Sequence, residues 1–539
     1  MPLRLSYRCR PRSSGGVRCG GGSILQEGVA ASVPAASLIA TLTTPLTPEL
    51  AAGLEGVAWL EVRADVVGDI DPEPLRHLFA GKLLYTLRSR AEGGAFEGSP
   101  ERRKRRLLAA AERYDRVDLE GARDLGPEIL TAIPPARRLV SWHGPASDLD
   151  ALAACFERLA AAEAALYKLV PWAIRPGEAL APLQLLHRLQ RADVAAFAGG
   201  DAGAWTRLIA PRLGAPVVYG AAGDDPGAPG QPSIRTLRQD FGLPALPPVE
   251  KLFGVIGNPI AHSLSPRLHN GAYRELGIPA LYLPFQTDAF GDFWLEVVEE
   301  GVLEALGLPI QGLSITAPFK PAALAVAGAE SPLAGLVGGA NTLVLREGVW
   351  EAESTDPEGV IEPLRDRGID PAGRRAAVVG AGGAGRAAAV GLAHAGAEVT
   401  LFNRGRERGE SAAADLGLPC LPLGELDPAG YDLLVNATPL GRAAGAAGAA
   451  GAAGAADEPL PFPVDALRPG AVVVDLVYRR EEEGPTPLLA AAAARGAVTV
   501  DGREVLMDQA RGQFRMMTGR ELPKDLARRL LGLPAARPG

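Results

Sequence analysis

The sequence predicts an α/β protein that begins with a (β/α)8 barrel and continues into a two-domain unit whose second domain has the Rossmann fold. Eight short apolar runs alternate with helical stretches between about residues 37 and 220. A Pro-rich segment without hydrophobic periodicity, GLPALPPVEK, follows at residues 242–251. A glycine-rich loop then joins a strand to a helix at residues 380–385, as in a nucleotide-binding βαβ unit.

Length and composition describe a multidomain globular protein. A chain of 539 residues is too long for one core and should hold about two to four domains. Hydrophobic residues make up 47% and charged residues 22%, and the mean hydropathy is +0.08, which is ordinary globular material. The net charge of -8 and the isoelectric point near 5.5 argue against a nucleic-acid or anionic-membrane partner, since either favours a basic face. We therefore expect small-molecule ligands.

The sequence predicts no metal site. The four cysteines lack CxxC spacing, and His262 and His269 lack a third ligand at a suitable spacing, so we expect a structural or loop role for both histidines. The absence of a disulfide framework favours a reducing cytoplasm. The cysteines are Cys9, Cys19, Cys155 and Cys420.

The N-terminal segment has an unusual composition. Residues 1–22 are rich in Arg, Ser and Gly and contain no acid, which is also a feature of organellar transit peptides. We favour a disordered tail or a misassigned start. No apolar run approaches the roughly 18 to 20 residues of a membrane span.

Lysine is rare in this chain. Of the 55 basic residues only six are lysine, so arginine serves wherever a positive charge is enough. A lysine retained inside an apolar strand is a candidate for chemistry that arginine cannot perform, because a guanidinium neither deprotonates nor forms an imine. The six are Lys82, Lys104, Lys168, Lys251, Lys320 and Lys524.

The eight apolar runs are the expected barrel strands, and polar residues stand where several of them end. The carboxyl ends of barrel strands carry the active site, so this coincidence predicts a site, although a single charge there is often only a solvated rim group. The runs are SLIATL, VAWLEVR, KLLYTLR, DRVDLE, RRLVSW, ALYKLV, DVAAFAG and PVVYG. The polar residues are Glu61, Arg63, Arg88, Asp118, Glu120, His143 and Lys168.

Lys168 and His143 are candidates for imine chemistry. Apolar residues flank Lys168, so its amine should be partly dehydrated and its pKa should fall toward neutrality, where a neutral amine attacks a ketone. His143 on the adjacent strand could take a proton beside the imine carbon and then protonate a leaving hydroxyl, with Glu92 orienting the imidazole. Guanidinium groups for a substrate carboxylate and hydroxyls would come from Arg63, Arg88 and Arg207.

The second unit contains a βαβ pattern. Its first part, to about residue 346, mixes strands and helices, and from Asp356 a helix leads into AAVVG, the glycine loop, a second helix and AEVTLFNR. Near Arg442 a run of AAG triplets separates DLLVNAT from AVVVDLVY. We interpret this run as a flexible insertion without chemistry.

The glycine loop indicates a dinucleotide site. Gly380, Gly382 and Gly385 form G-x-G-x-x-G between a strand and a helix, where backbone N–H groups can hold a pyrophosphate. The next strand ends in Asn403-Arg404 instead of the acid that would bind an NAD ribose. Arg404 and Arg408 suit the 2′-phosphate of NADP, although two ordinary surface arginines would leave the same pattern.

Short polar side chains precede the nucleotide unit. Ser263, Ser265 and Asn270 lie in GVIGNPIAHSLSPRLHN, and such groups hydrogen-bond a polyhydroxylated acid. Lys320 and Asp356, if brought together, could move a proton to or from an alcohol oxygen as hydride passes to or from a nicotinamide.

The first half resembles the type I 3-dehydroquinate dehydratases. The match runs from about residue 37 to 243 through EVRAD, YTLRSRAEGG, DLE, SWHG, LYKLV, WTRL and APGQ. The resemblance implies that Lys168 is the Schiff-base lysine, His143 the general acid and base, and Glu92 its partner. Gly227 in place of Ser and FAGG in place of a Met-Gly stretch depart from the family and are interpreted as altered substrate contacts. The implied substrate contacts are Glu61, Arg63, Arg88, Arg207 and Gln231.

The second half resembles the shikimate dehydrogenases from residue 252 to 531, a two-domain dehydrogenase with an α/β substrate domain and a Rossmann NADP-binding domain. The resemblance implies that Lys320 and Asp356 form the catalytic pair. Ser354, Phe319 and Arg442 stand where the family usually has Asn, His and Met. The implied shikimate contacts are Ser263, Ser265, Thr316, Asn341, Tyr478 and Gln509. The implied NADP contacts are Gly380, Gly382, Gly383, Gly385, Asn403, Arg404, Arg408 and Thr438.

These resemblances predict a bifunctional enzyme of the shikimate pathway, which leads to chorismate and the aromatic amino acids. The first half would dehydrate 3-dehydroquinate to 3-dehydroshikimate, and the second would reduce that product to shikimate with NADPH, in the cytoplasm and without a metal. An enzyme acting on quinate with NAD is opposed by Asn403-Arg404. A non-catalytic sensor of pathway intermediates would have lost catalytic residues, whereas all four of Lys168, His143, Lys320 and Asp356 are present.

The expected domains follow from these motifs. We predict a disordered tail over residues 1–30, the barrel over 31–245, a linker over 246–251, the shikimate-binding domain over 252–352, the NADP-binding domain over 353–500, and C-terminal helices over 501–539 that return to the substrate domain.

Overall fold

The computed structural model describes residues 36–145, 148–441, 460–480 and 483–535. The predicted tail, the AAG triplets and Arg442 lie outside the described residues. Among the described residues there are three sheets, one in the first half of the chain and two in the second.

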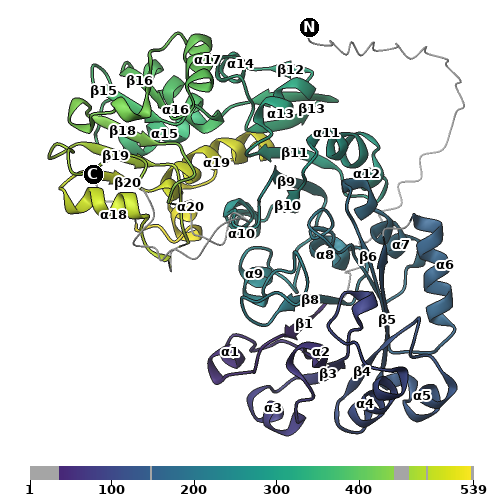
Figure 1. Ribbon diagram of the computed structural model, residues 1–539. Helices are drawn as coiled ribbons and strands as arrows, with labels where there is room; N and C mark the ends of the chain where they lie inside the picture. The colour runs from purple at the N-terminus through teal and green to yellow at the C-terminus, as the bar shows by residue number, and fades with distance from the viewer. Residues whose placement is uncertain (1–35, 146–147, 442–459, 481–482, 536–539) are drawn as a thin grey trace, which may run out of the picture. The chain divides into compact units, whose positions relative to one another are not determined.

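The first sheet is an eight-stranded parallel barrel in the order β7-β6-β5-β4-β3-β2-β1-β8, which confirms the predicted fold of the first half. All eight predicted apolar runs form its strands, and Figure 1 shows helices α4 to α7 outside them. The strands are β1 (Ser37–Leu42), β2 (Trp59–Arg63), β3 (Lys82–Thr86), β4 (Arg116–Glu120), β5 (Arg138–Pro145), β6 (Leu166–Trp172), β7 (Val194–Ala196) and β8 (Val217–Ala221). The helices are α1 (Pro48–Ala52), α2 (Ala64–Val67), α3 (Pro72–Leu78), α4 (Pro100–Arg113), α5 (Pro127–Ala132), α6 (Leu149–Ala160), α7 (Ala181–Leu189), α8 (Thr206–Ile209) and α9 (Ile234–Gln239).

The barrel interior is apolar toward the amino ends of the strands and charged toward their carboxyl ends. Ile39, Leu84, Leu139 and Leu166 meet inside the barrel in one buried cluster. Because the strands are parallel, every polar residue that ends a strand reaches the same face. The sequence pattern of apolar runs ending in charges therefore becomes one charged layer over an apolar floor.

The second sheet is mixed and has the order β10-β9-β11-β13-β14-β12. Its first strand begins at Lys251, so the last residue of the predicted linker already pairs with a neighbouring strand. The strands are β9 (Lys251–Gly257), β10 (Ala280–Gln286), β11 (Ile310–Ile315), β12 (Ala329–Glu330), β13 (Thr342–Arg346) and β14 (Val349–Glu353). The helices are α10 (Ser265–Leu276), α11 (Phe290–Phe293), α12 (Val302–Ala305), α13 (Lys320–Val326) and α14 (Pro332–Val337).

The third sheet is parallel, with the order β17-β16-β15-β18-β19-β20, which confirms the predicted Rossmann fold. The strand order reverses between β15 and β18, and ligands of such sheets bind at the carboxyl ends of the strands at that point. The strands are β15 (Arg375–Val379), β16 (Glu398–Asn403), β17 (Cys420–Pro422), β18 (Leu433–Asn436), β19 (Val472–Asp475) and β20 (Val498–Val500). The helices are α15 (Asp356–Arg365), α16 (Gly383–His394), α17 (Arg406–Leu416), α18 (Pro487–Ala494), α19 (Gly502–Thr518) and α20 (Lys524–Leu530).

The C-terminal helices pack against the second sheet. Met507 and Phe514 of α19 share a buried cluster with Phe253 of β9 and Tyr282 of β10. Gly359 of α15 lies so close to α19 that a Cβ there would be 2.9 Å from the Cβ of Gln509. Glycine at that position therefore lets α15 and α19 approach each other.

Arg103 fixes helix α4 to the barrel. Its Nε and Nη2 donate to the two carboxylate oxygens of Asp124 at 2.7 and 2.6 Å, and its Nη1 donates to the carbonyl of Leu87 at 2.5 Å. Asp124 in turn accepts from the backbone N–H of Glu120 at 2.7 Å. This buried guanidinium therefore joins α4 to the ends of β3 and β4.

We predict that Arg103→Met destabilises this part of the barrel by about 3 to 5 kcal/mol, because it leaves the Asp124 carboxylate buried without its cation. Native-state hydrogen exchange of peptides from α4 and β4 measures the loss locally. Lys104→Met is the matched control, since Lys104 lies on the same helix and forms only a surface ion pair with Glu128. Equal exchange rates in the two variants would contradict the prediction.

Candidate active sites

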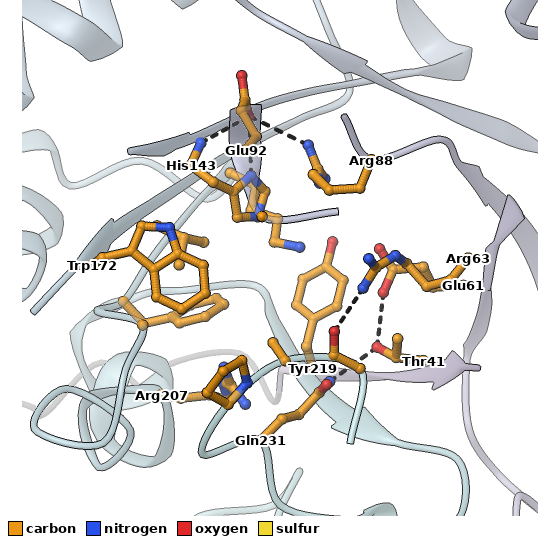
Figure 2. A pocket seen from close by; sticks show the side chains of 18 residues that line it. Thr41, Glu61, Arg63, Arg88, Glu92, His143, Trp172, Arg207, Tyr219 and Gln231 are labelled. Atoms are coloured by element: carbon orange, nitrogen blue, oxygen red, sulfur yellow. Dashed lines mark hydrogen bonds and ion pairs between the residues drawn. The ribbon is translucent and has the colours of Figure 1, made fainter. Parts of the chain in front are cut away.

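A pocket opens at the carboxyl ends of the barrel strands (Figure 2). The structure places there all eight residues that the sequence predicts for the first site. They are Glu61, Arg63, Arg88, Glu92, His143, Lys168, Arg207 and Gln231.

The amine of Lys168 lies in the centre of this charged layer. The side chain is buried, and its Nζ lies 3.9 Å from the centre of the Tyr219 ring. Burial lowers the pKa of Lys168 to about 8, with the carboxylate of Glu61 opposing the shift. No carboxylate of the described residues lies within ion-pair distance of Nζ. A substantial fraction of this amine is therefore neutral near physiological pH, as attack on a carbonyl requires.

His143 lies beside Glu92. The Glu92 Oε2 accepts from the backbone N–H of His143 at 3.0 Å and lies 3.3 Å from its Nδ1. Burial, with the nearby cations Arg88 and Lys168, holds the pKa of His143 well below its usual value. Burial and the neighbouring Glu120 raise the pKa of Glu92 to about 7. The imidazole is thus a neutral base whose partner carboxyl titrates near neutrality.

Arg88 is held by a ring of acceptors. It forms ion pairs with Asp118 and Glu120, and its Nη1 donates to Ser141 Oγ at 2.9 Å. Its Nη1 also lies 3.5 Å from Glu92 Oε2. These contacts keep the guanidinium at the pocket wall.

Glu61 is equally well fixed. Its carboxylate accepts from Thr41 Oγ1 at 2.8 Å and from Thr86 Oγ1 at 2.9 Å, and Gln231 Nε2 donates to the same Thr41 oxygen at 3.0 Å. Burial opposes ionisation, but Lys168 and Arg63 outweigh it and hold the pKa of Glu61 below its usual value. Glu61 is therefore the anion that balances the buried Lys168.

Arg63 and Arg207 differ in how their guanidinium groups are used. Arg63 pairs with Asp65 and donates from Nη1 to the carbonyl of Gly227 at 2.7 Å. Arg207 is 4% exposed, and its Nε and Nη1 have no hydrogen-bond partner among the described residues. Its guanidinium lies 4.7 Å from the centre of the Phe197 ring, and burial lowers its pKa to about 10. A buried cation with free donors at a pocket wall is a site for an anionic ligand group.

Several residues in or beside the pocket were not predicted as site residues from the sequence, and Arg123 lies beside the pocket without lining it. Arg123 donates from Nη1 to Glu92 Oε1 at 2.9 Å and to Glu120 Oε2 at 3.2 Å, so it helps to position the partner of His143. The only sequence signal for it was its place just after the DLE strand. Thr41 and the three aromatic residues Trp172, Phe197 and Tyr219 line the pocket, and apolar or small residues in a strand carry no signal that separates lining from core.

The second site is centred on a lysine and an aspartate from the second half of the chain. Lys320, at the start of α13, forms an ion pair with Asp356, at the start of α15. Asn341 Nδ2 donates to Asp356 Oδ1 at 2.7 Å, and Asn341 Oδ1 accepts from the backbone N–H of Thr355 at 2.9 Å. The structure thus brings together three residues that the sequence separates by up to 36 positions.

Gln513 supports this site and was missed by the sequence analysis. Its Nε2 donates to the carbonyl of Asn341 at 3.0 Å, and its Oε1 accepts from Ser314 at 2.9 Å. Gln513 lies one helical turn after Gln509, which the sequence did single out. Its role could not be read from the sequence because its partners lie far away in the chain, Ser314 on β11 and Asn341 just before β13.

The remaining predicted contacts of this half lie on neighbouring loops and helices. Ser265 is buried at the start of α10, and its N–H donates to Ser263 Oγ at 3.3 Å. Thr316 follows β11 and packs over Gly257. Gln509 lies on α19 and Tyr478 follows β19.

Asn270 and His269 have structural positions. Asn270 exchanges two hydrogen bonds with the backbone of Tyr282, at 2.9 and 2.7 Å, so its amide holds α10 to β10 and the sequence-based assignment as a ligand group is wrong. His269 is fully buried and stacked on the Tyr282 ring at 4.2 Å. No group of three or more potential metal ligands occurs among the described residues.

The glycine loop and the end of β16 lie side by side. A Cβ on Gly385 would be 1.8 Å from the carbonyl oxygen of Gly380, so only glycine allows α16 to start this close to β15. Asn403 Oδ1 accepts from the backbone N–H of Ala381 at 3.1 Å. A Cβ on Gly383 would touch the Lys320 side chain at 3.3 Å. The loop that would hold a pyrophosphate therefore lies next to the Lys320–Asp356 pair.

The other predicted nucleotide residues surround this loop. Thr438 follows β18 and donates to Asn436 at 2.7 Å, within contact of Gly380. Arg408 lies near Gly382, and both Arg404 and Arg408 are exposed. The first turn of α16 contains no acid. Backbone donors and two exposed guanidinium groups fit a dinucleotide with an additional phosphate.

Comparisons with known proteins agree with this division. The family model for type I 3-dehydroquinase matches residues 38–244, and that for the shikimate dehydrogenase substrate binding domain matches residues 255–343. A bifunctional 3-dehydroquinate dehydratase/shikimate dehydrogenase of Arabidopsis thaliana, named as chloroplastic, is 30% identical over 507 residues, covering 87% of this chain and 79% of the relative.

Two further proteins are similar to the second half. A shikimate dehydrogenase (NADP(+)) of Halobacterium salinarum is 38% identical over 276 residues, covering 50% of this chain and 95% of the relative. The crystal structure of shikimate 5-dehydrogenase from Thermus thermophilus in complex with NADP(H) and shikimate is 34% identical, with a TM-score of 0.43, covering 52% of this chain and 99% of that one.

We predict that the Lys168 amine titrates with a midpoint near pH 8, since burial lowers its pKa to about 8. Glu61→Gln should move the midpoint about one unit lower, because the lost carboxylate favoured the ammonium form. Competitive acylation across pH, with the Lys168 peptide quantified by mass spectrometry, measures both midpoints. Exposed Lys251 is the internal control and should not respond to Glu61→Gln. A midpoint that rises or stays constant would contradict the electrostatic link.

Proposed function

The chain belongs to the family of bifunctional 3-dehydroquinate dehydratase/shikimate dehydrogenases, and from this premise we propose which residues carry its two reactions. The barrel dehydrates 3-dehydroquinate to 3-dehydroshikimate, and the second half reduces 3-dehydroshikimate to shikimate with NADPH. The observation that supports the residue assignment best is the buried Lys168 amine, with a pKa of about 8, in one pocket with His143 and the unpaired Arg207.

Lys168 is the nucleophile of the dehydration. Its neutral amine attacks the C3 ketone, and loss of water from the carbinolamine gives an iminium ion. The positive nitrogen withdraws electrons and makes the neighbouring C2–H acidic. The ring of Tyr219 and the carboxylate of Glu61 both favour the cationic intermediate electrostatically.

His143 transfers the protons. The neutral imidazole takes the C2 proton, and the resulting enamine expels the C1 hydroxyl, which the imidazolium protonates to water. A second water then hydrolyses the imine and frees Lys168. Glu92 holds the imidazole in place through Nδ1, and its own pKa of about 7 lets it share the proton during the cycle.

The substrate is held by the other charged residues of the pocket. Arg207 has free donors for the carboxylate, and this placement orients the ketone toward Lys168. Arg63, Arg88, Glu61 and Gln231 line the same pocket and contact the hydroxyl groups. Gly227 offers no side-chain hydroxyl to the substrate. Its backbone carbonyl accepts a hydrogen bond from Arg63.

Lys320 and Asp356 carry the proton transfer of the reduction. The Lys320 ammonium, fixed by Asp356 and close to Gly383, donates a proton to the carbonyl oxygen as it becomes the alcohol of shikimate. Asn341 holds Asp356 in position. The proposed shikimate contacts besides Asn341 are Ser263, Ser265, Thr316, Tyr478 and Gln509.

NADPH, when bound, supplies the hydride for this step. The glycine loop of Gly380, Gly382, Gly383 and Gly385 would hold its pyrophosphate, and Arg404 and Arg408 its 2′-phosphate. Asn403 holds the loop through the backbone N–H of Ala381, and Thr438 lies beside Gly380. The exposed guanidinium groups of Arg404, just after β16, and of Arg408, on α17, favour NADP over NAD, which opposes the quinate enzyme with NAD as an alternative.

Side chains and NADPH supply every group that the two proposed steps use, so neither step calls for a metal, and the ligands are small molecules. None of the described helices is long and apolar enough to cross a membrane. Scattered cysteines without CxxC spacing support a cytoplasmic location, whereas the Arabidopsis relative is named as chloroplastic.

We predict that Lys168→Ala abolishes the dehydration, a loss of at least about 10³-fold, and leaves the reduction of 3-dehydroshikimate unchanged. Lys320→Ala should slow the reduction by about 10²-fold or more and leave the dehydration unchanged. Enone absorbance and NADPH loss, followed separately with each substrate, measure the two steps. Each variant is the control for the other, because both contain the whole chain.

Borohydride reduction in the presence of 3-dehydroquinate should trap a covalent adduct on Lys168, seen as a mass increase of the peptide that contains it. Trapping on another lysine would exclude Lys168 as the nucleophile, and no trapping at all would exclude the imine mechanism. Either result would leave the family assignment intact.

Arg404→Gln and Arg408→Gln should each raise the KM for NADPH by about tenfold or more and leave the KM for NADH unchanged, since each removes a charge-assisted contact to the 2′-phosphate. Initial rates with both nucleotides measure this effect. Arg406→Gln is the matched control, because Arg406 lies between them but is paired with Glu410. An equal rise in KM for NADPH and NADH would contradict the assignment.

A further inference from the structure

An indole ring forms one wall of the barrel pocket. Trp172 is the last residue of β6, four positions after Lys168, and lines the pocket. Figure 2 shows its ring between His143 and Arg207, across the pocket from Arg63 and Glu61. Two residues after it, Ile174 is 88% exposed and does not line the pocket.

Two glycines make room for this ring. Gly199 pairs with Trp172 across the parallel strands, with the N–H of Ala173 donating to the carbonyl of Gly199 at 3.0 Å. A Cβ on Gly199 would be 3.0 Å from Cε3 and 3.2 Å from Cζ3 of the indole. A Cβ on Gly93 would be 3.1 Å from Cζ2. Neighbouring side chains on parallel strands point the same way, so the indole fills the space that a side chain at position 199 would otherwise occupy.

The indole also touches the segment that carries the partner of His143. Gly93 ends the turn Arg90–Glu92 in the left-handed conformation, with a φ of 84°. The ring therefore spans from Gly199, which follows β7, to the Glu92 turn.

The pocket is divided into two kinds of surface. Charged groups occupy most of it, whereas Trp172, Phe197 and Val170 supply an apolar side. A substrate with a cyclohexane ring has C–H bonds on its ring faces as well as hydroxyl and carboxylate groups at its edge. An apolar wall can pack on those C–H bonds and exclude water from a reacting iminium ion.

We propose that Trp172 is a specificity-determining residue of the dehydration, whose indole packs on the substrate ring, and that Gly199 is glycine because the wall is built from β6 instead of β7. This inference rests on the proposed dehydratase function of the same pocket. Trp172 contributes no proton transfer. It acts by binding, so its loss changes KM more than kcat.

The test moves the side chain that forms the apolar wall from position 172 to position 199. Trp172→Ala should raise the KM for 3-dehydroquinate about tenfold, with kcat changed less than about threefold. Gly199→Met alone should also raise KM, because two side chains then compete for one space. The double variant Trp172→Ala/Gly199→Met should return KM to within about threefold of the wild-type value, since the methionine refills the wall.

Four controls separate binding from folding and from the chemical step. Ile174→Ala should leave KM unchanged, and the NADPH-dependent reduction, carried by the same chain, should be unchanged in every variant. Thermal unfolding should differ little between Trp172→Ala and the double variant. Borohydride trapping on Lys168 should persist in Trp172→Ala at saturating 3-dehydroquinate. Loss of trapping in the wild type would instead refute the proposed dehydration mechanism.

An unchanged KM in Trp172→Ala would overturn the proposal. Additive effects of the two substitutions, with no recovery in the double variant, would overturn it as well. A loss of thermal stability with a wild-type KM in the folded fraction would show that the indole is only a packing element.

Discussion

The burial of the Lys168 ammonium against the Glu61 carboxylate is the interaction on which the barrel site depends. Removing a charged group from water costs several kcal/mol unless other charges compensate it. Here Glu61 supplies the compensation at a distance that stops short of an ion pair, so the pKa of Lys168 falls only to about 8. A closer carboxylate would keep the amine protonated, and the absence of one would lower its pKa further. The amine is therefore available for attack without becoming a permanent neutral core residue.

The same balance organises the rest of the charged layer. Asp118 and Glu120 neutralise Arg88 and leave little negative charge for Lys168. Arg123 reaches Glu92 from outside and helps to balance the repulsion between Glu92 and Glu120. Among the described residues of this layer, Arg207 keeps two guanidinium nitrogens, Nε and Nη1, without a hydrogen-bond partner. Most charged groups of the layer are thus paired with one another, and the donors that remain lie where a keto acid would bind.

The sequence predicted the strands and their terminal charges well because both depend on local pattern. Each barrel strand is a short apolar run, and parallel strands bring their ends to one face, so Lys168, His143 and Glu61 could be placed together from the sequence. The Gly380 loop could be placed for the same reason. In each case a local signal and a rule of topology were sufficient.

What the sequence did not predict depends on pairings between distant segments. Gln513 was missed because its partners Asn341 and Ser314 lie more than 170 positions away. Asn270 was wrongly taken for a ligand group, because an amide that holds two elements together has the same local sequence as one that binds a substrate. Trp172 was missed because its meaning depends on the glycine beside it in space, at position 199. The departure FAGG, which contains Gly199, is visible in the sequence, but the residue that we propose explains it, Trp172, lies on β6.

The two lysines show how surroundings, and not residue type, assign a role. Lys168 is buried and has no carboxylate of the described residues within ion-pair distance, which suits a nucleophile that must lose its proton. Lys320 forms an ion pair with Asp356, which Asn341 and, through it, Gln513 hold in place, which suits a cation that must keep its proton until an oxygen needs it. Arginine could replace neither in full: it forms no imine at the first position, and at the second it releases no proton near neutral pH. In a chain that otherwise uses arginine almost throughout, lysine remains at the two positions where a proton must leave a buried or half-buried cation.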